Sequence, residues 1–276
     1  MPRPFAQVDV FTTEPYAGNP VAVVLDAAGL PPDAMKRFAR WTNLSETTFV
    51  LPPESPDADY RVRIFTPGRE LPFAGHPTLG TCHAWLQAGG VPRRDGAIVQ
   101  ECGAGLVPIR RTDDGLAFAA PPLVRSGPVD HALEERLARM LGIDRAAMAD
   151  TQWVDNGPGW VAVLLEDPAA VLALQPRFDA LDVGVVAPYP AASPVAFEVR
   201  AFTYKDGGVA EDPVTGSLNA SLAQWLLATG RASAPYVARQ GTALGRAGRV
   251  HVTQDADGAV WVGGGTVTRI RGEVDL

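Results

Sequence analysis

Two distant copies of one segment lie about half a chain length apart, and this duplication constrains the fold more than any other feature. The run Arg63–Thr66 (RIFT) returns as Arg200–Thr203 (RAFT). An HPxxG motif that begins at His76 is matched by a DPxxG motif that begins at Asp212. A period this long indicates duplication of a whole domain and not a solenoid of short repeats. We therefore expect two similar halves, related by a pseudo-two-fold axis, that bring His76 and Asp212 to one cleft.

Each half of the chain consists of several predicted short strands and one apolar helix. A helix is predicted between Pro77 and Gly89, and another over about 214–228, each with apolar residues on nearly every face. Helices of this kind are buried. The pattern predicts an α+β protein whose halves are sheets wrapped around a central helix. A linker predicted over 121–130 divides the chain into 1–122 and 123–276, with room for the C-terminal strand to return to the first half.

The composition is that of a globular protein without a nucleic-acid partner. The 276 residues are 46% hydrophobic and 20% charged, and the formal net charge is −7. An acidic protein is poorly suited to a phosphate backbone. No apolar run reaches the roughly 20 residues that cross a bilayer, and the first residues lack the apolar core of a signal peptide. We expect a cytoplasmic protein that binds neither nucleic acid nor membranes.

Residues at the two predicted helix starts are candidates for a functional site. Pro77 and Pro213 are predicted at the first helical position, where a proline costs no hydrogen bond. Asp212 would then be the N-cap, and plain capping accounts for it as well as a functional role does. His76 is a poor N-cap, so a titratable residue there indicates a role other than capping. Helix starts also offer free N–H groups and a positive dipole end, which suit a carboxylate ligand.

Glu46 is the candidate proton carrier of the first half. It stands at the start of a predicted strand, 47–51, of apolar and β-branched residues. Partial burial would favour the neutral form of its carboxyl group, as general acid/base catalysis requires, whereas an exposed edge carboxylate is the plain alternative. Asn19 in the turn Gly18-Asn19-Pro20 is either a polar contact of the site or a turn former.

Taken together, the motifs resemble one known family over essentially the whole chain, the phenazine-biosynthesis PhzF-type isomerases. No single motif is specific, but their combination and order are. The motifs that carry the resemblance are Asp9-Val10-Phe11, Gly18-Asn19-Pro20, Ser45-Glu46-Thr47, Gly75-His76-Pro77-Thr78, Glu211-Asp212-Pro213, Thr215-Gly216-Ser217, Gln240-Gly241 and Val262–Gly265.

The resemblance implies a diaminopimelate-epimerase-like fold, in which each half is a β-barrel-like sheet around a central helix and the active site lies between the halves. It also implies proton transfer without a cofactor or metal, and a homodimer. Glu46 would be the general acid/base, while Ser45, His76 and Asp212 would orient the substrate and assist proton transfer. The residues implied to hold the carboxylate or amino end of the substrate are Gly75, Gly216 and Ser217.

The cysteines distinguish this chain from the thiol-dependent epimerases of the same fold. Those enzymes carry paired cysteines at the two helix starts. Here Cys82 lies about two turns inside the predicted helix, and Cys102 is outside both helix starts. A two-thiol racemase is therefore disfavoured on chemical grounds.

We interpret the chain as a cofactor-independent isomerase that shifts a proton, and with it a double bond, on a small cyclic or unsaturated carboxylic acid. The alternatives are an amino-acid epimerase or racemase of the same fold, and a non-catalytic dimer that binds a small ligand. The joint presence of Glu46, His76 and Asp212 favours an enzyme. The sequence does not identify the substrate or the pathway.

Overall fold

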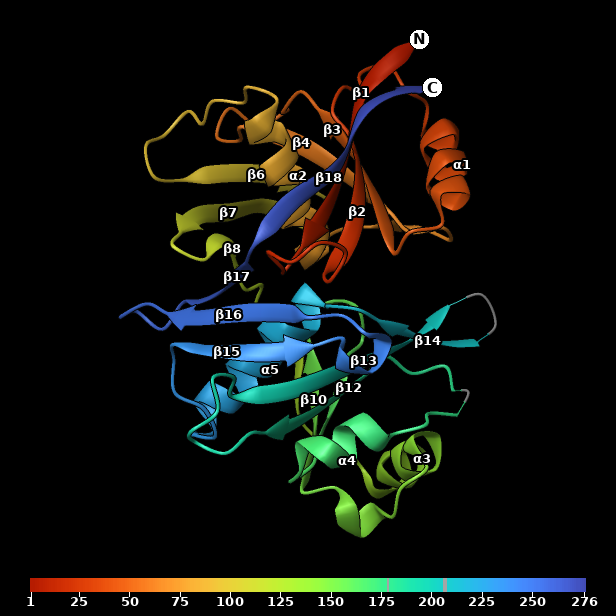
Figure 1. Cartoon of the computed structure of the whole chain (residues 1–276), viewed down its shortest axis with the longest axis vertical. Helices are drawn as coiled ribbons and strands as arrows, with labels where there is room; N and C mark the ends of the chain where they lie inside the picture. Colours follow the sequence, from red (N-terminus) through yellow and green to blue (C-terminus); the bar gives the residue numbers. More distant parts are fainter. Residues whose placement is uncertain (178, 206–207) are drawn as a thin grey trace. The chain divides into compact units, whose positions relative to one another are not determined.

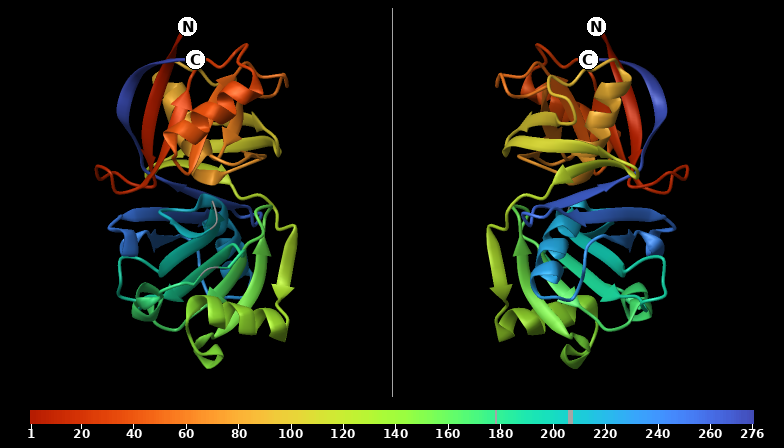
Figure 2. Two further views of the ribbon diagram at one scale, coloured as in Figure 1. Left: turned by 90° about the vertical axis from the view of Figure 1, so that its right-hand side faces the viewer. Right: turned by 90° about the vertical axis from the view of Figure 1, so that its left-hand side faces the viewer.

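The chain folds into two compact units in a computed structural model that describes residues 1–177, 179–205 and 208–276 (Figure 1). The first unit comprises Met1–Ala119 together with Gly263–Leu276, and the second comprises Ala120–Val262. The C-terminal strand therefore belongs to the first unit. It lies beside the N-terminal strand, as the blue and red ribbons show in Figures 1 and 2.

The first unit is a mixed sheet with two helices. Strand β1 pairs in antiparallel fashion with both β18 and β2, β2 runs parallel to β3, and β3 is antiparallel to β4. Strand β4 pairs with β5 and β6, and β6, β7 and β8 form an antiparallel meander. The elements are β1 (Pro2–Val10), β2 (Asn19–Val24), α1 (Pro32–Thr42), β3 (Glu46–Leu51), β4 (Tyr60–Phe65), β5 (Glu70–Leu71), α2 (Gly75–Gln87), β6 (Ile98–Cys102), β7 (Gly105–Thr112), β8 (Gly115–Ala119) and β18 (Thr266–Asp275).

The second unit repeats this order of pairing. Strand β10 lies between β9 and β11, β11 runs parallel to β12, and β12 is antiparallel to β13. Strand β13 pairs with β14 and β15, and β15 with β16. The elements are β9 (Arg125–Pro128), α3 (His131–Leu141), the 3₁₀ turn η1 (Arg145–Ala147), β10 (Asp150–Asp155), β11 (Val161–Leu164), α4 (Pro168–Ala173), β12 (Val183–Pro188), β13 (Phe197–Lys205), β14 (Gly208–Asp212), α5 (Gly216–Ala228), β15 (Tyr236–Gln240), η2 (Thr242–Leu244), β16 (Gly248–Gln254) and β17 (Val260–Gly264), the last of which continues into the first unit.

The repeated RIFT and RAFT segments occupy equivalent places in the two sheets. Arg63 on β4 makes a bidentate ion pair with Glu70, with both N–O distances 2.7 Å. Arg200 on β13 binds Glu211 in the same way, at 3.0 and 2.7 Å. Strand β5 pairs with β4, and β14 pairs with β13, both in antiparallel fashion, so the two Arg–Glu ion pairs lie in matching hairpins. The predicted α+β fold with two similar halves is confirmed.

A buried helix fills each unit, as the apolar pattern predicts. In the first unit α2 packs against β1, β2, β3, β8 and β18, and its Leu79 and Cys82 are fully buried. Gly80 permits this packing, because a Cβ atom there would lie 2.3 Å from Val21 Cγ1. In the second unit α5 packs against β10 and β16, with Leu218 and Ala220 fully buried.

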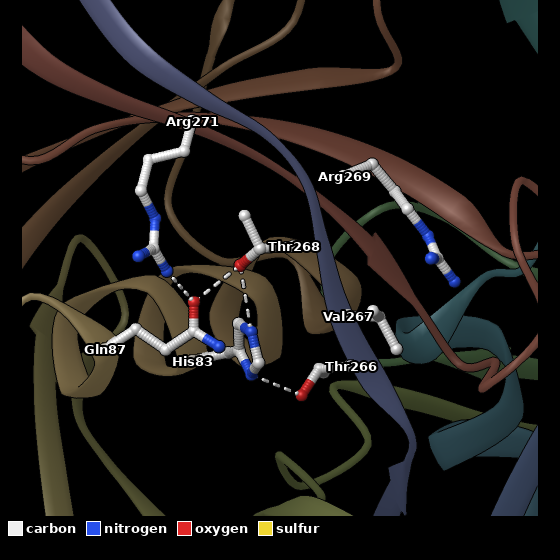
Figure 3. A pocket seen from close by; sticks show the side chains of 7 residues that line it. All are labelled: His83, Gln87, Thr266, Val267, Thr268, Arg269 and Arg271. Atoms are coloured by element: carbon white, nitrogen blue, oxygen red, sulfur yellow. Dashed lines mark hydrogen bonds between the residues drawn. The ribbon is translucent and has the colours of Figure 1, made fainter.

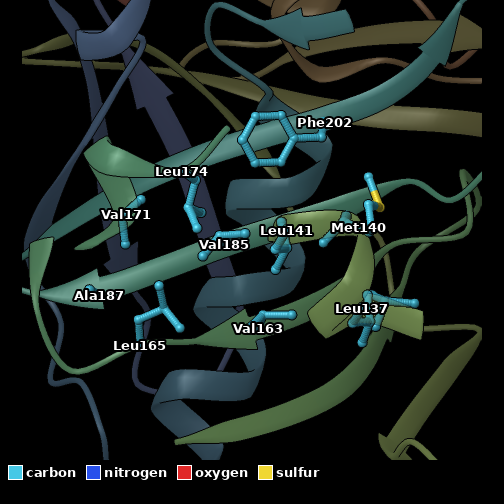
Figure 4. Packing of buried hydrophobic residues seen from close by; sticks show 12 residues of the cluster. Leu137, Met140, Leu141, Val163, Leu165, Val171, Leu174, Val185, Ala187 and Phe202 are labelled. Carbon is cyan, nitrogen blue, oxygen red and sulfur yellow. The ribbon is translucent and has the colours of Figure 1, made fainter. Parts of the chain in front are cut away.

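A second apolar layer of the C-terminal unit lies under α3 and α4 (Figure 4). Leu137, Met140 and Leu141 of α3 meet valines of the neighbouring strands, and Leu133 is partly buried against the same cluster. These four residues are the apolar stripe that helical spacing places on one face. This layer packs on β11–β13, and β13 pairs with β14, the strand that ends at Asp212.

The predicted helix starts and the predicted linker are wrong in detail. Helix α2 begins at Gly75 with Ala74 as its N-cap, so His76 and Pro77 lie within the first turn. Helix α5 begins at Gly216 with Thr215 as its N-cap, so Asp212 is not its cap. Proline is tolerated within a first turn because those N–H groups have no intrahelical partner, so Pro77 does not fix the first residue of α2. Pro213 lies three residues before Gly216 and is outside α5. Within 121–130, β9 forms a strand paired with β10, where a linker was expected.

Candidate active site

Three side chains predicted from the sequence meet in the first unit. His76 Nε2 lies 3.4 Å from Glu46 Oε2, with the histidine side chain 4% and the glutamate side chain 13% exposed. On the other side of the ring, Asn19 Nδ2 lies 3.2 Å from His76 Nδ1. Asn19 is fully buried. The imidazole is thus held between an amide and a carboxylate in a site that is largely removed from bulk water.

The topology of the sheet brings these residues together. Asn19 is the first residue of β2, and Glu46 is the first residue of β3. The two strands are parallel neighbours, and Glu46 pairs with Val21. His76 is the second residue of α2, which packs on both strands. The start of the central helix therefore meets the starts of two parallel strands.

The hydrogen bonds around His76 select one tautomer. With the Asn19 amide nitrogen donating, Nδ1 of His76 accepts and the ring proton resides on Nε2. Nε2 lies 3.4 Å from Glu46 Oε2. Protonation of His76 would therefore place a positive charge next to the carboxylate of Glu46 and form an ion pair.

Asp9 supports the turn before Asn19, and the sequence reasoning did not select it as a site residue. Its Oδ1 accepts a hydrogen bond from the backbone N–H of Gly18 at 3.1 Å, and its side chain is buried. Gly18 is required there, because a Cβ atom would lie 2.2 Å from the carbonyl oxygen of Val10. The available signal was a single carboxylate in an otherwise apolar strand segment, Val8–Val10.

Ser45 and Gly75 flank the same residues. Ser45 directly precedes Glu46 and is half-buried, while Gly75 is the buried first residue of α2. Both therefore lie next to the His76–Glu46 contact along the chain.

In the second unit, the predicted residues Asp212, Gly216 and Ser217 surround the start of α5. Asp212 is the last residue of β14 and is 7% exposed. Its Oδ2 accepts a hydrogen bond from the hydroxyl of Thr215 at 2.6 Å. Gly216 and Ser217 are the first two residues of α5. The hydroxyl of Ser217 accepts from Trp160 Nε1 at 3.1 Å.

By position on the central helices, Gly75-His76 corresponds to Gly216-Ser217. Both helices contain 13 residues, and each pair opens its helix. The HPxxG and DPxxG motifs are thus not in structural register, because Asp212 lies before its helix and His76 lies inside its own. The expectation that His76 and Asp212 share one cleft stays a prediction, since the structure defines each unit by itself.

The two cysteines are poor candidates for chemistry. Burial raises the pKa of the Cys82 thiol to about 12. Burial likewise raises the pKa of Cys102. Neither residue lies at the start of α2 or α5, and Cys82 faces the core of the first unit. Both thiols are therefore protonated at neutral pH.

A solvent-open pocket of about 510 Å³ lies elsewhere on the first unit, between α2 and β18 (Figure 3). His83 contacts the hydroxyls of Thr266 and Thr268 through its two ring nitrogens, at 2.9 and 3.0 Å. Burial, and then the charge of Arg271, lower the pKa of His83. None of the predicted site residues lines this pocket. The network ties the C-terminal strand to the central helix.

No group of three or more His, Cys, Asp or Glu side chains within the described residues could hold a metal ion. No helix in the described parts of the chain is both long and apolar enough to span a membrane.

Comparison with known proteins gives consistent results. The family model of phenazine biosynthesis-like proteins (PhzC-PhzF) matches residues 8–272. Trans-2,3-dihydro-3-hydroxyanthranilate isomerase of Pseudomonas aeruginosa is 35% identical over 92% of this chain and 91% of its own length. Antisense-enhancing sequence 1 of Schizosaccharomyces pombe is also 35% identical, over 98% of this chain and 97% of its own.

Solved structures agree with the family and the fold. A phenazine biosynthesis protein of the PhzF family from Bacillus anthracis superposes with a TM-score of 0.83 at 25% identity, and both chains are covered completely. A hydroxyproline epimerase from Agrobacterium vitis superposes with a TM-score of 0.60 at 13% identity, over 99% of this chain and 92% of its own, which shows a shared fold alone. The diaminopimelate-epimerase-like fold is therefore confirmed. The chain belongs to the family of phenazine biosynthesis-like proteins, and it is an isomerase.

Proposed function

We propose that this isomerase moves a proton, and with it a double bond, on a small cyclic or unsaturated carboxylic acid, without a cofactor. The observation that carries the proposal is the contact of Glu46 with His76, in a site that is largely closed to water. A carboxyl group can take a proton from one carbon and return it to another if neighbouring groups adjust to its change of charge. His76 is placed to do so.

Glu46 is the general acid/base in this proposal, and His76 stabilises its charged form. When Glu46 holds a proton, the substrate can accept it at carbon. When Glu46 becomes a carboxylate, the imidazole of His76, with Nε2 3.4 Å away, stabilises the negative charge. Asn19 acts through His76, because its buried amide fixes the tautomer of the imidazole. Asn19 is then a positioning residue, and not the direct substrate contact that its turn position suggested.

The substrate-holding roles remain those expected from the sequence. Gly75 and Gly216 open the two central helices, where free N–H groups suit a carboxylate. Ser45, Ser217 and Asp212 add polar contacts. The relative named trans-2,3-dihydro-3-hydroxyanthranilate isomerase indicates a suitable test compound, since that name describes a partly unsaturated ring acid with an amino and a hydroxyl group. We also propose a homodimer, which light scattering of the purified protein can test.

An epimerase or racemase is the second candidate, because the fold is shared with a hydroxyproline epimerase. Thiol-dependent epimerisation would need reactive cysteines at the helix starts. This chain has Gly75-His76 and Gly216-Ser217 there, and its two thiols lie elsewhere. Double-bond isomerisation by a carboxyl group is therefore favoured.

The test is turnover of trans-2,3-dihydro-3-hydroxyanthranilate by the wild type and three variants. Glu46→Gln keeps the shape of the side chain but cannot cycle a proton, so we expect turnover to fall by about 10³-fold or more while binding is kept. Glu46→Asp should recover part of the activity. Glu70→Gln is the matched control in the same unit, since the carboxylate of Glu70 pairs with Arg63. Near wild-type turnover by Glu46→Gln would exclude Glu46 as the acid/base.

A further inference from the structure

We infer that Thr215 and Gln240 hold Asp212 as a hydrogen-bond acceptor, and that both are positioning residues of the active site. The functional part of this inference rests on the proposed function, whereas the hydrogen-bond assignment stands on the second unit alone. Both residues belong to motifs of the family resemblance, but neither was assigned a role in the site from the sequence.

The orientation of the Gln240 amide is fixed by two backbone groups. Its Oε1 lies 3.0 Å from the backbone N–H of Thr215, which can only donate. Its Nε2 lies 3.0 Å from the carbonyl oxygen of Asp212, which can only accept. Asn219 Nδ2 also donates to Oε1, at 2.7 Å. A flipped amide would break all three contacts, so the assignment does not depend on a choice between similar atoms.

This orientation determines to which acceptor the Thr215 hydroxyl donates its hydrogen bond. Gln240 Nε2 donates to Thr215 Oγ1 at 3.0 Å, so the hydroxyl oxygen is already an acceptor. A hydroxyl has one proton to give. It lies 2.6 Å from Asp212 Oδ2, and the proton goes there. Asp212 therefore receives a hydrogen bond from a group that is itself held in place.

The first unit contains the same clamp without the acid. Gln100 is on β6, the counterpart of β15, and its Nε2 donates to Thr78 Oγ1 at 2.9 Å. The hydroxyl of Thr78 then donates to the backbone oxygen of Ala74, also at 2.9 Å. In both units a buried glutamine on the sheet fixes a threonine hydroxyl near the start of the central helix. Only in the second unit does the hydroxyl end on a carboxylate.

A carboxylate held in this way is suited to bind a donor group and not to carry the proton of the reaction. A carboxylate can accept more than one hydrogen bond, so Asp212 can also accept from an amino or hydroxyl group of the substrate. Asp212 and Glu46 therefore have different tasks in the proposed site. Glu46 faces a histidine that adjusts to its charge, whereas Asp212 faces a hydroxyl that donates to it.

The experiment follows the carboxyl carbon of Asp212 by NMR in protein labelled with ¹³C-aspartate, as a function of pH. Asp212→Asn identifies the resonance. In Thr215→Val the hydroxyl is lost, and we expect Asp212 to take up its proton at a higher pH than in the wild type, because one hydrogen bond to its carboxylate is missing. Thr215→Ser should restore the wild-type curve. Gln240→Met should also move the curve upward, while the matched control Gln100→Met should leave it in place.

A second measurement connects the clamp to catalysis. With trans-2,3-dihydro-3-hydroxyanthranilate as the substrate, Thr215→Val should move the acid limb of kcat/KM to higher pH, and Thr215→Ser should move it back. If the wild type does not turn over this compound, the proposed function fails for this substrate, but the NMR titration still tests the clamp. The inference is overturned if Asp212 titrates in Thr215→Val as it does in the wild type, or if Gln100→Met shifts it as far as Gln240→Met.

Discussion

The two matching Arg–Glu pairs should contribute very differently to stability, because they differ in burial. Arg200 and Glu211 have side chains that are 6% and 10% exposed, whereas Arg63 and Glu70 are 22% and 38% exposed. Both pairs are bidentate, and both arginines lie over a phenylalanine ring, at 4.9 Å for Phe202 and 5.1 Å for Phe65. The two pairs thus share their geometry and differ mainly in how far they are buried.

Glu211→Gln removes the negative partner of a buried guanidinium. Breaking a buried pair on one side costs about 3–5 kcal/mol. Arg200 also donates to the carbonyl oxygens of Val171 and Leu174, at 3.0 and 2.9 Å, and these contacts would remain. We therefore expect a loss of about 3 kcal/mol, at the low end of that range. Glu70→Gln breaks a solvated pair and should cost about 1 kcal/mol or less.

Differential scanning calorimetry and urea unfolding would measure both variants. At about 2–4 °C per kcal/mol, Glu211→Gln should lower Tm by about 6–12 °C, and Glu70→Gln by less than about 4 °C. The effect of Glu70→Gln should disappear near 1 M salt, where exposed charges are screened, while that of Glu211→Gln persists. The double change Arg200→Met with Glu211→Leu should recover part of the loss, since no buried charge remains unpaired. Equal destabilisation by the two single variants would refute the argument from burial.

Two further outcomes follow from the core of the first unit. Cys82→Ala should keep most of the turnover. In the wild type, the Cys82 thiol should resist iodoacetamide at pH 8 until urea unfolds the protein. If alkylation instead inactivates the enzyme, and a bound ligand prevents this, a thiol mechanism must be reconsidered. Burial raises the pKa of Cys82 from 9.0 to about 12, so the thiol ionises at lower pH in the unfolded protein than in the folded one. The contribution of the buried thiol to stability is therefore complete below pH 9 and is lost as the pH rises toward 12. Between these pH values, the free energy of unfolding of Cys82→Ala should depend less steeply on pH than that of the wild type. Gly80→Ala should cost about 1–3 kcal/mol, because the new Cβ would lie 2.3 Å from Val21 Cγ1. Gly272→Ala, with nothing within 4 Å of its Cβ, is the control, and equal stability of the two alanine variants in urea would contradict the packing of α2 on β2.

The sequence by itself determined the features that depend on local pattern. Two apolar helices, the repeated arginine segments and the strand that begins at Glu46 are visible because periodicity and strand propensity act over a few residues. The order of the motifs along the chain was enough to identify the family. The duplication was enough to predict two similar halves, because a repeated pattern of hydrophobic residues produces the same pairing of strands in each half.

The tertiary structure decided which polar atoms meet. Asn19, Glu46 and His76 come together only through the parallel register of β2 and β3 and the packing of α2. The clamp of Gln240 on Thr215 joins residues that lie on different elements. Short motifs also misplaced the helix starts, since Pro77 fits inside the first turn of α2 and Pro213 lies before the N-cap of α5. Hydrogen bonds of this kind depend on long-range register at a precision of a few tenths of an ångström, and no local propensity encodes that register.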